Sequence, residues 1–167
     1  VDLRNLADYH AAQAQFEVTL DQEQDVQWMP SALAGERVQF VGVGTVDAVV
    51  DFTNLSSGAV VVSDDGTSVV VTLPQPSLAA PVLDHDQSHV MNRDRGLLNR
   101  VGGMFSDNPT SENELYQAAA DKMADAAAAT DLRQRAEDNT KVMLYTLFKS
   151  LGYTKVDVRF QVSSASV

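Results

Sequence analysis

The chain has 167 residues, no cysteine and a formal net charge of −11. Its length fits one domain, and a composition that is 44% hydrophobic and 21% charged is that of an ordinary globular protein. Without cysteine, neither a disulfide framework nor a thiolate zinc site can form. Residues 1–83 hold only 2 basic residues against 11 acidic ones, which disfavours nucleic acid and anionic membrane surfaces as partners.

The first half of the chain has the pattern of a β-sheet. Apolar and polar residues alternate over 9–20, which predicts a half-buried strand. Residues 37–52 are apolar on both faces, which predicts a central strand: one long strand bent near its glycines, or two strands that meet at a corner. Gly42 and Gly44 within it indicate a bulge, a bend or a close backbone approach. Asp64-Asp65-Gly66 between two apolar stretches predicts a β-hairpin, because Asp-Gly favours the positive φ angles of a tight turn.

The segment between the hairpin and the helices has weaker patterns. Residues 77–92 are expected to form short extended pieces with a loop. Three arginines around apolar residues in 93–105 predict a short helix that ends at Gly102-Gly103. Residues 106–110 are then a connecting segment.

Two helices and a strand are predicted for the second half. Ser111 and Glu114 fit a capping box, which predicts a helix from Glu112 to about Ala129. A second helix starts near Asp131 and ends before Gly152. Alternation over 156–162 predicts a final strand. The predicted apolar stripes are Leu115, Ala119, Met123 and Ala126 in the first helix, and Leu132, Ala136, Asn139, Met143 and Leu147 in the second.

This order of elements predicts an α+β fold. An antiparallel or mixed β-sheet from the N-terminal half packs against two C-terminal helices and is closed by a final strand. We expect a single soluble domain over 1–167.

The best candidate for a ligand site lies between residues 84 and 100. Two histidines four residues apart with carboxylates beside them have the donor types of a metal site. In an extended segment, however, these histidines would lie about 13 Å apart. The acidic spacing also lacks the glycine and the terminal glutamate of a calcium loop. A solvated loop and local ion pairs are the alternative, so no metal or other cofactor is assigned. The candidate residues are Asp84, His85, Asp86, His89, Arg93, Arg95 and Arg100.

No catalytic residue is assigned. The chain has no Gly-x-Ser-x-Gly elbow and no cysteine nucleophile. Asp47 and Asp51 lie four residues apart on one strand face, where their carboxylates can pair for acid–base work or form an exposed polar face. A hydrolase would need a pocket that gathers these two aspartates and a histidine.

The segments TVDAVVDFTNL (45–55), TLPQP (72–76), Leu83-Asp84 and Arg95-Gly96-Leu97 resemble the DUF4230 family of uncharacterised bacterial proteins. The later helices are similar to the C-terminal part of that family, so the resemblance covers about Tyr9 to Phe160. It implies an N-terminal membrane anchor ahead of Val1, which the given sequence does not include, and a soluble domain on the extracytoplasmic side of the cell membrane. It brings no catalytic residues.

The sequence therefore supports two hypotheses. The first is a membrane-tethered extracytoplasmic domain, not an enzyme, that binds another protein or assembles with itself. The second is a small-ligand or metal-binding module that uses residues 84–100.

Overall fold

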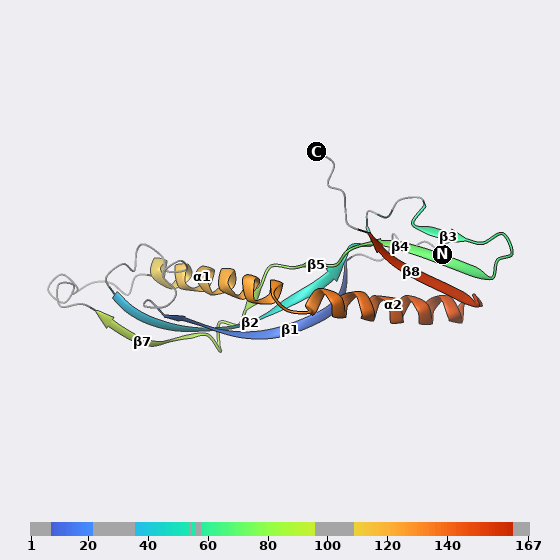
Figure 1. The fold of residues 1–167 in the computed structure, drawn as a ribbon. Coiled ribbons are helices and arrows are strands. Elements are labelled where there is room, and N and C mark those ends of the chain that lie inside the picture. The colour runs from blue at the N-terminus through green and yellow to red at the C-terminus, as the bar shows by residue number, and fades with distance from the viewer. Residues whose placement is uncertain (1–7, 22–35, 54, 56–57, 96–108, 162–167) are drawn as a thin grey trace, which may run out of the picture. The chain divides into compact units, whose positions relative to one another are not determined.

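The computed structural model describes residues 8–21, 36–53, 55, 58–95 and 109–161. Strands fill the N-terminal half, two helices follow, and a last strand comes after them, which confirms the predicted α+β fold (Figure 1). The strands are β1 Tyr9–Asp21, β2 Glu36–Val50, β3 Val60–Val62, β4 Ser68–Pro74, β5 Ser77–Leu78, β6 Val82–Leu83, β7 His89–Arg95 and β8 Lys155–Gln161, and the helices are α1 Pro109–Ala128 and α2 Leu132–Ser150.

The strands form two sheets. A five-stranded sheet has the order β1-β2-β5, with β6 and β7 also paired to β2. β5, β6 and β7 all run antiparallel to β2. A three-stranded sheet has the order β3-β4-β8, in which β3 is antiparallel to β4 and β8 is parallel to it. The predicted central strand is therefore confirmed, as one long strand and not as two strands that meet at a corner.

The chain divides into two compact units. The first unit comprises Val1–Gln13, Asp47–Ala79 and Thr130–Val167, and the second comprises Ala14–Val46 and Ala80–Ala129. Two of the four divisions fall within β1 and β2, and the other two fall between β5 and β6 and between α1 and α2. Each unit has buried apolar side chains of its own, such as Leu73 and Phe148 in the first and Phe40 and Met123 in the second.

In the second unit, α1 packs closely against β2. A Cβ built on Gly42 would lie 2.8 Å from the Ala119 Cβ, and one on Gly44 would lie 3.1 Å from the Met123 Cε. The two glycines thus mark a close approach, which is one of the three explanations that the sequence allowed. The register irregularity of β2 lies elsewhere, between Gln39 and Phe40.

In the first unit, the predicted hairpin is confirmed as β3 and β4. Gly66 has a φ of 69°, and its N–H donates a 2.9 Å hydrogen bond to the Ser63 carbonyl. One face of β4 is fully buried, because its alternate residues Val69, Val71 and Leu73 are at most 1% exposed. Their partners on β8 are Val156, Val158 and Phe160, which are half-buried. The alternation of β8 therefore places its apolar side on the covered face of this sheet.

Helix α2 buries a different stripe from the predicted one. Leu132 and Ala136 are buried as predicted, but Asn139 is exposed, and Met143 and Leu147 are half-buried. A row of every fourth residue is buried instead, namely Leu132, Ala136, Thr140, Leu144 and Phe148.

Thr140 is the physical reason for this difference. Its Oγ1 donates a 2.7 Å hydrogen bond to the Ala136 carbonyl, so its only polar side-chain group is satisfied inside the helix. Asn139 is exposed and its amide donates a 2.8 Å hydrogen bond to the Ala11 carbonyl. A polar residue therefore occupies the buried row, which a search for apolar spacing overlooks. In α1, Leu115, Ala119 and Met123 are buried as predicted, and the stripe ends on Ala127, since Ala126 is half-buried.

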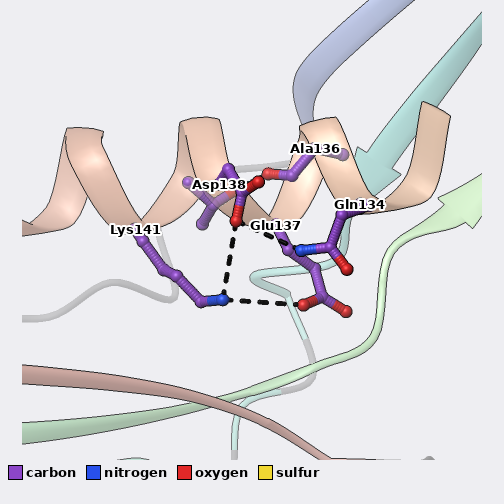
Figure 2. Close-up of polar contacts among 6 residues, drawn as sticks. Gln134, Ala136, Glu137, Asp138 and Lys141 are labelled. Carbon is purple, nitrogen blue, oxygen red and sulfur yellow. Dashed lines mark hydrogen bonds and ion pairs between the residues drawn. The ribbon is translucent and has the colours of Figure 1, made fainter. Parts of the chain in front are cut away.

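Helix α2 carries a small charged network, shown in Figure 2. The Lys141 Nζ lies 3.7 Å from a carboxylate oxygen of Glu137 and 3.7 Å from one of Asp138. Gln134 donates a 3.2 Å hydrogen bond to Asp138. The Lys141 ammonium also lies 5.6 Å from the centre of the Phe160 ring in β8. Lys141 thus links the helix surface to the neighbouring strand.

Two predicted boundaries are wrong. Residues 93–95 were expected to start a helix but belong to β7, where the backbones of Arg93 and Arg95 pair with Val38 and Glu36. The rest of that predicted helix, 96–105, lies outside the described residues. Helix α1 starts at Pro109 and not at Glu112, so residues 109–110 are not a connection. Proline suits a first helical turn because it has no N–H to leave unpaired.

This earlier start moves Ser111 inside α1, so the prediction of Ser111 as the capping residue is also wrong. The end of α2 agrees with its prediction, because Gly152 follows the helix with a φ of 98°.

In the part of the chain that the structure describes, no helix is both long enough and apolar enough to cross a membrane.

Candidate functional site

Asp84, the first of the predicted site residues, shapes a turn between β6 and β7. One of its carboxylate oxygens accepts hydrogen bonds from the backbone N–H groups of Asp86, at 2.9 Å, and Gln87, at 3.1 Å. The other oxygen accepts from the Gln87 side-chain amide. The backbone carbonyl of Asp84 accepts from the N–H of Ser88 at 3.0 Å. Asp84 is therefore held in one orientation by its own turn.

These hydrogen bonds also set the charge of Asp84. The bond from the Gln87 side chain, followed by the bond from the Gln87 N–H, lowers the pKa of the Asp84 carboxyl below its usual value. Asp84 is thus a fixed negative charge at neutral pH. No described basic residue forms an ion pair with it.

The two histidines of this segment do not converge. The centroids of the His85 ring and the Tyr116 ring in α1 are 4.5 Å apart. The Tyr116 ring in turn packs edge-on against Phe40, with 5.1 Å between the two ring centroids. The Nδ1–H of His89 donates a 3.0 Å hydrogen bond to the Gln87 carbonyl. Each histidine therefore has a separate partner. Among the residues described, no three His, Cys, Asp or Glu side chains form a group that could hold a metal ion.

The remaining predicted site residues have no described role in a site. The Asp86 side chain is exposed, and its backbone N–H belongs to the Asp84 turn. The side chains of Arg93 and Arg95 lie outside what the structure describes, as does the whole of Arg100.

A cleft of about 400 Å³ lies beside Asp84, entirely within the second unit. Strand β2 contributes residues 43–45 to it, and Gln15 comes from β1. Val82 and Leu83 of β6 and then Asp84 and Gln87 of the turn complete its lining.

Thr45 and Val82 of the lining lie on the side of β2 that faces away from α1. Gly44 points toward Met123 of α1, and successive strand residues point to opposite faces, so Thr45 points away from the helix. Thr45 pairs with Val82, which is 68% exposed. Sequence reasoning identified Asp84 but missed Gln15 and Thr45, because only strand pairing brings them beside the turn.

A second polar cluster lies in the first unit. The His10 Nδ1–H donates a 2.6 Å hydrogen bond to one oxygen of Asp47, and the Gln13 amide donates a 2.7 Å bond to the other. The bond from Gln13, followed by the bond from His10, lowers the pKa of the Asp47 carboxyl. The His10 side chain is 62% exposed.

This pair meets only part of what a hydrolase would need. Asp47 does contact a histidine, but the Asp51 carboxylate accepts hydrogen bonds from the N–H and the hydroxyl of Thr53. A carboxylate that holds Nδ1–H orients an imidazole for use at its other nitrogen. The described contacts of Asp47 and His10 include no third group with a nucleophilic role.

The fold and these two clusters define an α+β protein of two compact units with a cleft in one of them. The chain belongs to the DUF4230 family, described as a protein of unknown function, and the match covers residues 2–158. The predicted family membership is therefore confirmed. Neither a curated protein nor a solved structure matches the chain.

Proposed function

We propose that this chain is a membrane-tethered, extracytoplasmic module without catalytic activity that assembles with a second copy of itself. The observation that supports assembly is the outer strand β3 of the three-stranded sheet. β3 consists of three valines, and Val61 and Val62 are 55% and 44% exposed. Within the described residues β3 pairs only with β4, so its other edge presents backbone N–H and C=O groups.

The opposite edge of the same sheet differs in character. β8 exposes Lys155, Asp157 and Arg159 at alternate positions, and Arg159 forms a 2.6 Å ion pair with Asp157. Charged residues on an edge strand oppose the addition of another strand, because pairing would bury them. β3 carries no such protection, which makes it the better edge for strand addition.

The sequence around β3 favours a second copy in antiparallel orientation. A two-fold axis at Val61 would place Val60 opposite Val62 and Asp64 opposite Gly58. Asp64 would then face an uncharged residue and not its own copy. A parallel arrangement would put Asp64 beside its own copy, where like charges repel.

Sedimentation equilibrium across a range of protein concentrations tests self-assembly. We expect a dimer whose dissociation constant rises in Val61→Lys, because the substitution brings two lysines together at the axis. Val142→Lys is the matched control, since Val142 is 66% exposed on α2 in the same unit and lies off the edge. A wild-type monomer at all concentrations, or equal weakening by both substitutions, would overturn the proposal.

The tether and its side of the membrane rest on the family resemblance and need a separate test. The natural protein that contains this chain should sediment with membranes after cell lysis. A protease added outside intact spheroplasts should digest the domain. Release of the protein into the soluble fraction, or protection from the external protease, would contradict this part.

A further inference from the structure

We infer that the cleft beside Asp84 binds a small organic cation, an ammonium group on a short aliphatic stem. This goes beyond the proposed assembly and does not depend on it, because β3 belongs to the first unit and the cleft to the second. The argument rests on three features of the cleft: its size, its single charge and its exposed apolar wall.

The size suits a small ligand. Sites for small molecules have volumes of roughly 300–1,000 Å³, and this cleft measures about 400 Å³. Gly44 contributes only backbone on the face toward the cleft, and it allows β6 to lie against β2. A Cβ at Gly44 would come 2.6 Å from the Val82 carbonyl.

The charge selects a cation. Among the described lining residues Asp84 alone is ionisable, and its orientation is fixed by Gln87 and by two backbone N–H groups. A carboxylate oxygen can accept more than one hydrogen bond, so an ammonium group can bind without displacing these donors. Gln15 and Thr45 supply further polar atoms to the lining.

The apolar wall of the cleft favours a ligand with an aliphatic stem. Val82 lines the cleft and is 68% exposed. Contact with a short alkyl chain would remove part of this apolar surface from water. A bare metal ion would leave the wall unused, and an organic anion would be repelled by Asp84.

The experiment titrates the protein with n-butylammonium at pH 8 and follows backbone amide resonances by NMR. We expect saturable shifts at residues 43–45 and 82–87, with weak affinity, since the cleft is open. n-Butanol, which has the stem without the charge, should give much smaller shifts. Wild-type protein without saturable shifts at tens of millimolar would overturn the inference.

Asp84→Asn and Asp86→Asn form a matched pair. Both remove one negative charge from the same turn, but only Asp84 lines the cleft. Asn keeps the side-chain oxygen that accepts the turn hydrogen bonds, so the turn should persist. We expect Asp84→Asn to weaken binding about tenfold, as loss of a charge-assisted hydrogen bond does. Asp86→Asn should bind nearly as wild type.

Equal effects of the two substitutions would mean that the ammonium follows the net negative charge and not the cleft, and this would overturn the inference. Thr45→Leu provides an independent test of where the ligand binds. A larger apolar side chain beside Val82 should fill the cleft and abolish the shifts while the protein stays folded. Undiminished binding in Thr45→Leu would place the ligand elsewhere and overturn the inference as well.

Discussion

Gly44 lies so close to the backbone of Val82 that a Cβ on Gly44 would come within 2.6 Å of the Val82 carbonyl oxygen. The neighbour of Val82, Leu83, is the pairing partner of Gly44 in the sheet. The same Cβ would lie 3.1 Å from the Met123 Cε in α1. A glycine at this position therefore lets a strand and a helix approach β2 together.

Gly44→Ala should destabilise the protein. The added methyl group meets a backbone carbonyl that cannot rotate away, so β6 or β2 must shift. Forced overpacking of this kind costs about 1–3 kcal/mol. Equilibrium unfolding in urea measures the loss. Gly58→Ala is the control, because no described atom lies within 4 Å of a Cβ at Gly58. If both variants unfolded at the wild-type midpoint, the close approach would be wrong.

Gly66→Ala should destabilise for a different reason. No described atom lies within 4 Å of a Cβ built there, but the φ of Gly66 is 69°. Residues with a Cβ lose roughly 1–2 kcal/mol in this left-handed region. We expect a loss of that size in urea unfolding, and Gly66→Asn should lose less, because asparagine tolerates this conformation. Equal losses for Ala and Asn would argue against backbone strain as the cause.

The elements that local pattern determines were predictable from the sequence. The hairpin followed from Asp64-Asp65-Gly66, and the central strand from its two apolar faces. The buried stripe of α2 was not predictable in the same way, because Thr140 occupies the core with its hydroxyl bonded to Ala136. Apolar spacing detects only side chains that are apolar, so a polar residue satisfied within its own helix shifts the expected face.

Only the part of the candidate site that a single turn forms could be predicted from the sequence. Asp84 was one of seven candidate residues, and the structure places it in the lining of the cleft. His85 and His89 were also candidates, yet each contacts a different partner. Thr45 lies 39 positions before Asp84 in the chain, and reaches the cleft through the pairing of β2 with β6. Local spacing carries no information about such pairings.

Substitutions in α2 test the corrected stripe directly. Leu144→Ala should destabilise by about 2–5 kcal/mol, because it leaves a cavity in a fully buried position. Met143→Ala, at a half-buried position of the same helix, should cost clearly less. If the stripe predicted from the sequence were the buried one, Met143→Ala would lose more stability than Leu144→Ala, since that stripe includes Met143 and leaves Leu144 out. Urea unfolding of the two variants side by side distinguishes these arrangements.

The Asp47 cluster should make stability depend on pH in the acidic range. Hydrogen bonds from Gln13 and then His10 lower the folded-state pKa of the Asp47 carboxyl below its ordinary value of 3.8. A carboxyl with a lowered pKa contributes stability above its unfolded pKa, and this contribution is lost as the pH falls through the folded value. Wild-type protein should therefore have a higher thermal midpoint than Asp47→Asn at neutral pH.

This difference should shrink as the pH falls from about 5 toward 2. Gln13→Leu should show a smaller version of the same change, since it removes the larger of the two hydrogen-bond contributions but leaves His10. Asp64→Asn, at an exposed aspartate of the hairpin loop, serves as the charge-matched control. The difference in thermal midpoint between wild type and Asp47→Asn could instead stay constant or widen on acidification. That result would show that the ionised carboxylate of Asp47 does not stabilise the pairing of β1 with β2.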